Sequence, residues 1–274
     1  ITHFINTHSL PHIDLIASHG HTVFHQPELG ITKQIGSGEE IAKLTRVQVI
    51  YDFRRQDIAL GGQGAPLVPI GDKILFNESD ACLNMGGFAN VSFDKQNKRI
   101  AYDIGACNLI LNHFAQKLGY EYDDQGLIAR GGTYDKSLLK ELNDIDYYNF
   151  NPPKSLAREF TESKLLPMLS NYDEKTVLHT YTKHIGFQIG VSLTKSKATK
   201  CLVTGGGVYN SFLMDQIQKH TSCSLVIPNH TIVEYKEALV FALLGILRNE
   251  NKINVLSSVT GATRDHSSGR IAKP

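Results

Sequence analysis

Residues 83–108 constrain the fold more than any other stretch, because two short apolar runs are joined there by a polar turn at residues 94–97. Gly86 and Gly87 interrupt the first run, and the second is predicted to end at Asp103, before a glycine and an amphipathic helix. Glycines inside a strand mark a bulge or a close backbone approach. Backbone N–H groups at such a bend can bind a phosphate, and a nearby strand-end carboxylate can act as a general base. The pattern predicts two strands in a hairpin and indicates phosphoryl transfer.

The rest of the chain alternates apolar strand-like runs with segments of helical spacing. This alternation predicts an α/β fold, in which ligands bind at the carboxyl ends of strands. A domain boundary is expected near residues 77–80, where a polar stretch precedes the hairpin. Further strands are expected at residues 13–17, 47–53, 201–204 and 224–227, and helices at 39–45, 109–118, 174–195, 211–220 and 236–249.

Composition narrows the class of protein. Apolar residues make up 41% of the 274, which is enough for a packed core, and the length allows one large or two medium domains. With 28 basic and 27 acidic side chains, nucleic acid and anionic membrane are not the expected partners. No apolar run is long enough to span a membrane. The four cysteines lie far apart, which favours reduced thiols of a cytoplasmic protein over a disulfide framework.

Two glycine-rich runs could hold a nucleotide. Gly86 and Gly87, followed by Asn90, could place backbone N–H groups around a β- or γ-phosphate, although a plain β-bulge explains the pair equally well. Gly205, Gly206 and Gly207 follow a predicted strand and precede a helix. They could bring the backbone against an adenosine or α-phosphate, and a tight turn is the equally good alternative.

Charged residues at predicted strand ends offer further chemistry. Asp103 could polarise a nucleophile or hold Mg²⁺ through water; its alternative, a helix cap, fits the spacing less well. Arg54 and Arg55 could bind a carboxylate or phosphate, or form a solvated surface pair, and the residues alone do not decide. Glu237 is placed in the first turn of its helix, where the helix dipole alone accounts for an acidic residue.

His19 and His21, with His25 nearby, raise the possibility of a metal site. Their spacing does not suit a helical pair of ligands, and no carboxylate or cysteine lies at ligand spacing. A hydrogen bond from His19 or His21 to a substrate is therefore favoured over zinc, and no metal ligands are assigned.

Several runs, taken together and in order, carry a specific family resemblance. They include residues 16–25, 52–67 (DFRRQDIALGGQGAPL) and 83–90 (LNMGGFAN), then PPKS at 152–155 and Arg158–Glu159, the triple glycine with Asn210, KEA at 236–238 and SVTGA at 258–262. Over about residues 13–270 the chain closely resembles the anhydro-N-acetylmuramic acid kinase family, and the run at 52–67 is the most distinctive.

The resemblance implies two α/β domains, ribonuclease-H-like, around a central nucleotide cleft, as in the sugar kinase, actin and heat-shock-70 ATPase superfamily. Residues 1–79 would be the remainder of the N-terminal domain, 80–255 the C-terminal nucleotide-binding domain, and 256–274 a segment packing back on the first. The implied enzyme is cytoplasmic and dimeric, uses ATP and Mg²⁺, and works in bacterial peptidoglycan recycling. It opens 1,6-anhydro-N-acetylmuramic acid with water and phosphorylates O6, giving N-acetylmuramic acid 6-phosphate and ADP.

The resemblance also implies roles for individual residues. Asp103 would be the general base that activates water for attack on the anomeric carbon while O6 attacks the γ-phosphate. The ATP-binding positions would be Gly86, Gly87, Asn90, Gly205, Gly206 and Gly207. The sugar contacts would be His19, His21, Arg54, Arg55 and Glu237.

Two departures from the family pattern stand out. The G-T-S-x-D-G phosphate loop expected near the N-terminus does not occur, and the chain starts at Ile1, so we expect the beginning of the natural protein to be missing. The second is Asp103-Ile-Gly-Ala-Cys-Asn108 in place of D-x-G-P-G-N, where Cys107 disfavours the positive φ that glycine permits. A non-catalytic sugar-binding or sensing module therefore stands as the alternative to the kinase. A third possibility, a chaperone-like ATPase of the same superfamily, is disfavoured because it gives the run at residues 52–67 no role.

Overall fold

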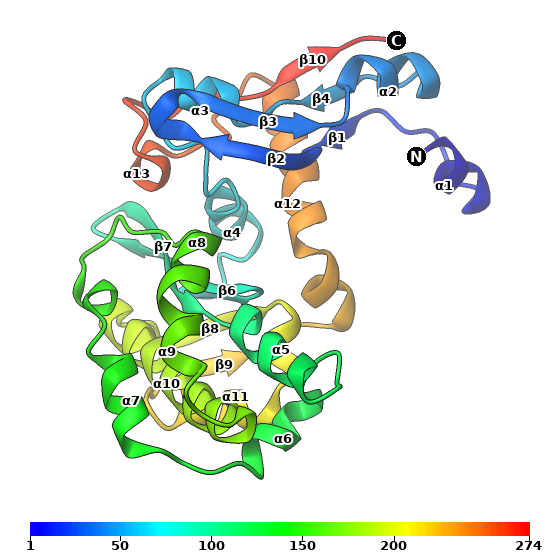
Figure 1. Ribbon diagram of the computed structural model, residues 1–274. Helices are drawn as coiled ribbons and strands as arrows, with labels where there is room; N and C mark the ends of the chain where they lie inside the picture. The colour runs from blue at the N-terminus through cyan, green and yellow to red at the C-terminus, as the bar shows by residue number, and fades with distance from the viewer. The chain divides into compact units, whose positions relative to one another are not determined.

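The computed structural model describes all of residues 1–274, which form two compact units. Unit 1 comprises Ile1–Leu75 and Tyr235–Pro274, and unit 2 comprises Phe76–Glu234. The helical residues from Tyr235 onward thus group with unit 1, whereas the sequence-based division assigned residues 80–255 to the C-terminal domain. Each unit combines strands and helices, so the predicted α/β class is confirmed (Figure 1).

Unit 2 is organised around a five-stranded mixed sheet with the order β7-β6-β5-β8-β9. Strands β5, β6 and β7 form an antiparallel meander, and β8 and β9 continue the sheet parallel to β5. Their bounds are β5 Ala81–Met85, β6 Phe88–Lys95, β7 Lys98–Ala106, β8 Lys200–Thr204 and β9 Ser224–Val226.

The hairpin predicted from residues 83–108 is present, with two corrections. The turn lies at Gln96 and Asn97, which both adopt positive φ. Gly86 and Gly87 do not interrupt one strand: β5 ends at Met85 and β6 begins at Phe88, so the pair forms the connection between two strands. Asp103 does not end its strand either, because β7 continues to Ala106. The small apolar residues after Asp103 stay in the ladder, paired with the start of β6.

Helices cover the sheet of unit 2. The longest is α10 (Glu174–Ser196), which contacts α5, α6, α7 and α11 as well as β6 and β7 (Figure 1). Tyr181 of α10 lies in the main core and is the largest fully buried side chain of the protein. The other elements are α5 Asn108–Lys117, α6 Leu127–Arg130, α7 Lys136–Asn143, α8 Arg158–Phe160, α9 Leu166–Leu169, α11 Ser211–Gln218, a π-helical turn at Thr161–Leu165, and short 3-10 turns at Asp124–Gly126, Asp146–Asn149 and Gly206–Tyr209.

Unit 1 has a smaller sheet with the order β1-β4-β10 and a separate two-stranded hairpin, β2-β3. Strand β4 (Val49–Tyr51) is central, parallel to β1 (Ile16–Ser18) and antiparallel to β10 (Arg270–Ala272). All three residues of β4 are buried. The remaining elements are α1 Thr2–Thr7, β2 His21–Gln26, β3 Ile31–Ile35, α2 Gly38–Thr45, α3 Arg55–Ala59, α4 Pro69–Leu75, α13 Ser257–Thr260 and a 3-10 turn at Pro27–Leu29.

Helix α12 (His230–Asn249) corrects the placement of Glu237. The helix begins six residues before the predicted start at residue 236, so Glu237 does not lie in the first turn. The helix-dipole explanation for this carboxylate therefore fails, since that effect falls off within the first turn. Farther along α12, Val240, Phe241 and Leu244 pack into a core with Ile50 and Phe53 of unit 1.

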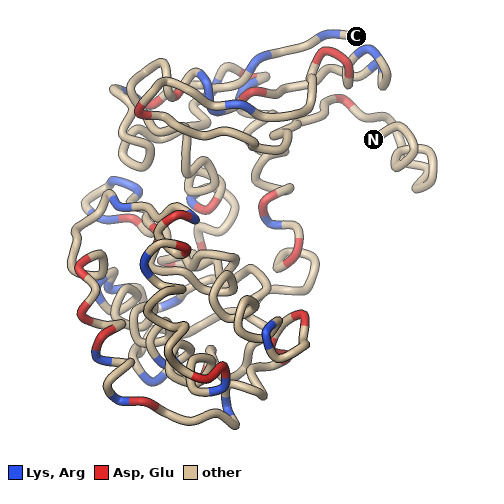
Figure 2. Tube along the Cα trace, viewed as in Figure 1, with Lys and Arg blue, Asp and Glu red and all other residues tan.

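Charges and cysteines follow the expectations from composition. Lys and Arg are interspersed with Asp and Glu along the trace (Figure 2). All four cysteines are buried and free. The helices of this fold are too short or too polar to cross a membrane.

Candidate functional site

The two glycine runs of unit 2 meet at Met85, where β5 ends beside β8. Asn84 of β5 pairs in parallel register with Thr204 of β8, so both glycine runs follow the ends of neighbouring strands. A Cβ built on Gly205 would lie 2.8 Å from the main-chain carbon and oxygen of Met85, and Gly205 has a φ of +83°. The connection at this point is therefore restricted to glycine by both contact and backbone angle.

The first glycine pair is anchored to the start of α5. The N–H groups of Cys107 and Asn108 donate to the carbonyl oxygens of Gly87 (2.7 Å) and Gly86 (3.1 Å). The Asn108 side chain donates to the carbonyl of Met85 at 3.1 Å. The run from Asp103 to Asn108 thus supports the glycine connection although Cys107, with a φ of −122°, replaces the family's glycine.

A row of polar residues crosses the sheet of unit 2 beside these loops. Thr204 pairs with Asn84, Asn84 with Asn90, and Asn90 with Asp103 on four successive strands. Directly paired residues project from the same face of a sheet. Asn90 thus belongs to a strand and not to the glycine loop. The sequence analysis missed Asn84 and Thr204, which only the strand register connects to the other two.

Asp103 is held by the segment that follows the 3-10 turn at Asp146–Asn149. The N–H of Leu156 donates to Oδ2 of Asp103 at 2.9 Å, while Oδ1 accepts no hydrogen bond. The hydroxyl of Tyr147 donates to the Asp103 carbonyl at 2.5 Å, and the Asp103 N–H donates to the carbonyl of Lys154 at 3.3 Å. Burial raises the pKa of Asp103, and the Leu156 hydrogen bond lowers it in part. One carboxylate oxygen is fixed and the other can accept a proton.

In unit 1, four of the five predicted sugar contacts come close together. Nε of Arg54 donates to Nε2 of His19 at 2.9 Å, and Nη1 of Arg54 donates to the carbonyl of Gly64 at 2.7 Å. Since Nε2 accepts, Nδ1 of His19 carries the proton and donates to the carbonyl of Gly20 at 2.8 Å. His21 and Glu237 lie within electrostatic range of His19.

The electrostatics of this cluster keep His19 neutral. Burial lowers the pKa of His19 and the Arg54 guanidinium lowers it further, while the Gly20 hydrogen bond and Glu237 act in the opposite direction. Burial also lowers the pKa of Arg54, opposed by Glu237. Glu237 is exposed and forms no hydrogen bond or ion pair of its own. The cluster therefore presents one anchored cation and one available carboxylate, which suit hydroxyl and carboxylate groups of a ligand.

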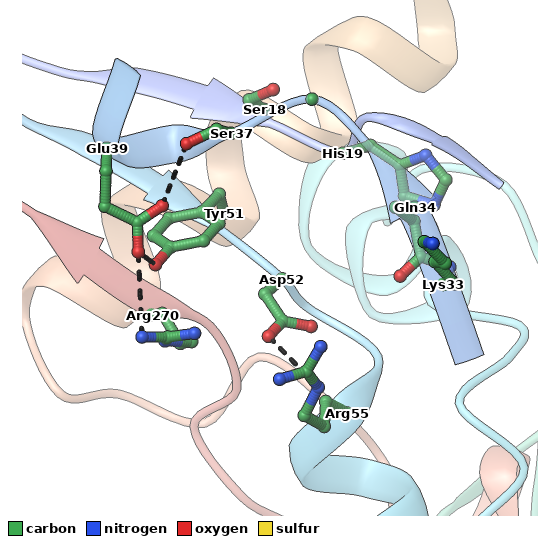
Figure 3. A pocket seen from close by; sticks show the side chains of 11 residues that line it. Ser18, His19, Lys33, Gln34, Ser37, Glu39, Tyr51, Asp52, Arg55 and Arg270 are labelled. Atoms are coloured by element: carbon green, nitrogen blue, oxygen red, sulfur yellow. Dashed lines mark hydrogen bonds and ion pairs between the residues drawn. The ribbon is translucent and has the colours of Figure 1, made fainter. Parts of the chain in front are cut away.

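Arg55 lies apart from this cluster, in a pocket of about 230 Å³ that His19 also lines. Its Nε lies 3.4 Å from Oδ2 of Asp52, and two-thirds (66%) of its side chain is exposed. Figure 3 shows Arg55 paired with Asp52, while Glu39 contacts Tyr51 and Arg270 on the other side of the pocket. The neighbouring arginines thus separate: Arg54 is anchored on loop backbone and Arg55 faces the pocket. The remaining lining residues are Ser18, Lys33, Gln34, Gly36 and Ser37.

The titratable side chains do not assemble into a metal site. No group of three or more His, Cys, Asp or Glu residues is placed to hold an ion. His25 lies with Nδ1 3.2 Å from the Thr32 hydroxyl, so its ring takes part in the β2–β3 hairpin.

Comparison with known proteins identifies the family of the chain. Residues 2–274 match the family model described as "Anhydro-N-acetylmuramic acid kinase". The chain belongs to this family. Anhydro-N-acetylmuramic acid kinases of Sulfurimonas denitrificans and Aliivibrio fischeri are 33% and 35% identical to it, each over 98% of this chain and 78% of the relative. The chain thus spans about three quarters of the length of these anhydro-N-acetylmuramic acid kinases.

Solved structures with a similar fold include component A of the Acidaminococcus fermentans (R)-2-hydroxyglutaryl-CoA dehydratase. It is 15% identical with a TM-score of 0.42, covering 65% of this chain and 66% of that one. A xylulose kinase from Brucella ovis has a TM-score of 0.35 at 11% identity, over 71% of this chain and 43% of its own.

Proposed function

We propose that this protein is an ATP-dependent kinase that opens 1,6-anhydro-N-acetylmuramic acid with water and phosphorylates O6. The observation that carries the proposal is the family membership of a chain that keeps Asp103 partly buried, with one carboxylate oxygen hydrogen-bonded and the other free to accept a proton. The products would be N-acetylmuramic acid 6-phosphate and ADP. In this proposal water adds to C1, the C1–O6 bond breaks, and O6 forms a new bond to the γ-phosphorus as ADP leaves.

Asp103 would take the proton from the attacking water. Its Leu156 contact fixes the carboxylate, and its unoccupied Oδ1 is the oxygen available to accept the proton. A pKa raised by burial makes this carboxylate a stronger base than an exposed aspartate. Activity should therefore fall as the pH drops through that raised pKa, because the protonated acid cannot act as a base.

The nucleotide would be held by Gly86 and Gly87 on one connection and by the Gly205–Gly207 run on the other. Gly206 supports this assignment, since a Cβ there would meet nothing nearer than the Asn108 amide nitrogen at 3.8 Å, so space adjoins its backbone. Phosphoryl transfer depends mainly on positioning and on stabilisation of charge, which such loops supply. Mg²⁺ would be carried by the phosphates of the nucleotide.

The sugar would be bound by the cluster around His19. The Arg54 guanidinium, the His19 ring and the Glu237 carboxylate provide donors and acceptors for sugar hydroxyl, amide and lactyl carboxylate groups. His21 and Arg55 would extend this set. The proposed enzyme would be a homodimer that acts in peptidoglycan recycling in the cytoplasm.

The test is mass spectrometry after incubation with ATP, Mg²⁺ and 1,6-anhydro-N-acetylmuramic acid in ¹⁸O-labelled water. The expected product carries one phosphoryl group and one labelled oxygen at C1, and it is absent without ATP and with Asp103→Asn. A phosphorylated sugar without the label would contradict the coupled ring opening. Sugar binding by calorimetry with no product under any condition would favour the non-catalytic sugar-binding or sensing module instead.

A further inference from the structure

Asp57 is a completely buried carboxylate for which the proposed chemistry has no use. Its exposed fraction is 0%, and it lies in α3, three residues after Arg54. Burying a carboxylate is costly unless hydrogen bonds compensate it. The partners that compensate Asp57 therefore indicate its purpose.

Those partners belong to the glycine-rich loop after α3 and to the end of α13 with the residues that follow it. The N–H of Gly64 donates to Oδ2 of Asp57 at 2.6 Å, and the hydroxyl of Thr260 donates to Oδ1 at 2.7 Å. Nε2 of His266 lies 3.5 Å from the same Oδ1. A Cβ on Gly62 would lie 2.3 Å from Oδ2, so the loop passes directly over the carboxylate.

Main-chain hydrogen bonds join the same two segments. The N–H of Gln63 donates to the Thr260 carbonyl at 2.9 Å, and the N–H of Thr263 donates to the Leu60 carbonyl at 3.0 Å. The distinctive run at residues 52–67 is thus fastened to the run at 258–262. We call Asp57, Gly64 and Thr260 the buried clasp.

The buried clasp is linked through Gly64 to the cluster around His19. Gly64 donates its N–H to Asp57 and accepts the Arg54 guanidinium on its carbonyl, and Arg54 donates on to His19. Gly64 has a φ of +69°, and a Cβ there would lie 3.3 Å from Cβ of Arg54. The orientation of Arg54 therefore depends on where the Gly64 peptide is held.

We propose that Asp57 is a positioning residue for sugar recognition, which fixes Gly64 so that Arg54 is directed toward His19. The inference rests on the proposed function, in which Arg54 and His19 contact the sugar. Asp57 touches no substrate and acts only through Arg54, with Thr260 holding the second carboxylate oxygen.

Asp57→Asn tests the proposal, because the amide cannot accept both hydrogen bonds. Sugar affinity by calorimetry should fall about tenfold or more, the range expected for one hydrogen bond to a charged group. ATP affinity should not change. Val255→Ala removes volume from the same core without touching the buried clasp, so it controls for a general loss of stability.

A double-mutant cycle separates positioning from a merely structural role. In an Arg54→Gln background, Asp57→Asn should cause little further loss of sugar affinity, because its effect acts through Arg54. Fully additive losses would overturn the proposal. If Asp57→Asn does not fold, Thr260→Val carries the same test, and Thr260→Ser, which keeps the hydroxyl, should restore wild-type affinity.

The His19 ring gives a readout that needs no sugar. Its pKa, measured by NMR, should rise in Asp57→Asn as Arg54 moves away, toward the value in Arg54→Gln, with Glu237 and His21 as the other charged neighbours. It should stay unchanged in Val255→Ala. An unchanged His19 titration in Asp57→Asn would refute the positioning role, and this measurement does not require sugar. Failure of the wild type to bind the sugar would instead refute the proposed function.

Discussion

The candidate sites of the two units consist of different kinds of chemical group. In unit 2 the proposed nucleotide site consists of backbone, with the Asp103 side chain beside it: glycine connections follow the ends of β5 and β8, and N–H groups at the start of α5 donate to the carbonyls of Gly86 and Gly87. In unit 1 the proposed sugar site consists of side chains, with Arg54 and His19 linked by a hydrogen bond and Glu237 nearby. The difference matches the ligands proposed, since phosphates suit repeated N–H donors and a sugar needs distinct groups at distinct positions.

The two sites are also held by different means. The five-stranded sheet of unit 2 places its loops through strand register and through hydrogen bonds from the start of α5. Unit 1 has only a three-stranded sheet there, and the segment after β4 is held by the buried clasp. Backbone placement should therefore be sensitive to an added methyl group, whereas side-chain placement should be sensitive to a lost hydrogen bond.

The largest effect is expected from Asp103→Asn. Turnover should fall about 10²–10⁴-fold, the usual contribution of a general base, because the amide cannot accept the proton from water. The amide oxygen of the variant can still accept the hydrogen bond from the Leu156 N–H, so the fold and the affinities for both ligands should persist. Steady-state kinetics with parallel calorimetry on both ligands provides the check, and near-normal turnover would refute the assignment.

Gly205→Ala should damage the backbone-built site next most strongly. The new Cβ would lie 2.8 Å from main-chain atoms of Met85 at a φ of +83°, so strain and overpacking together should cost about 2–5 kcal/mol. ATP affinity and the urea midpoint should both fall. Gly131→Ala is the matched control, because Gly131 lies outside both glycine runs and its Cβ would have no contact closer than 3.6 Å. Equal damage from both variants would show that close contact and backbone angle are not what make Gly205 necessary.

Arg54→Gln should break the side-chain-built site without affecting ATP. Loss of the hydrogen bonds to His19 and Gly64 should weaken sugar binding by about 1.5–3 kcal/mol. Arg55→Gln should have a smaller effect, because Arg55 is largely exposed and already paired with Asp52. Calorimetric titrations of both variants with sugar and with ATP decide this, and a reversed order would assign the sugar to the pocket that Arg55 faces.

The backbone-built site was more predictable from sequence than the side-chain-built one. Glycine runs that follow apolar strands can be recognised in the sequence. The helices predicted at 109–118, 174–195 and 211–220 are present, with errors only at their ends. The end of β7 was wrong because Gly105 and Ala106 continue the ladder instead of ending it. Glu237 was misplaced because the β-branched residues Thr231, Ile232 and Val233, which have a low helix propensity, conceal the first turn of α12.

Long-range contacts were beyond the sequence pattern. The clasp joins Asp57 to Thr260 across 203 positions, and no local pattern reports that an aspartate is buried. Asn84 and Thr204 likewise look ordinary until the strand register aligns them with Asp103. The predicted individual site roles remain predictions, and the experiments above test them.

The effect that is smallest near neutral pH concerns two histidines, one in each unit. His184 in α10 is fully buried, with Nδ1 2.7 Å from Oδ1 of Asn143 and Nε2 2.9 Å from the Tyr148 hydroxyl. Burial lowers its pKa from 6.5 to about 3. His19 has a lowered pKa too, but it belongs to the proposed sugar-binding cluster. The titration of His184 should therefore appear in stability, and that of His19 in ligand binding.

For His184 the pH window follows from the direction of the shift. Between pH 6.5 and about 3 the unfolded chain binds a proton at this ring and the folded chain does not, so acid favours unfolding. The contribution is intact above pH 6.5 and falls by about 1.4 kcal/mol per pH unit below it. In urea unfolding of unit 2, His184→Gln should be less stable than wild type at neutral pH and lose less stability on acidification. The exposed His12→Gln serves as control, and parallel pH profiles for wild type and His184→Gln would show that the ring is not buried neutral.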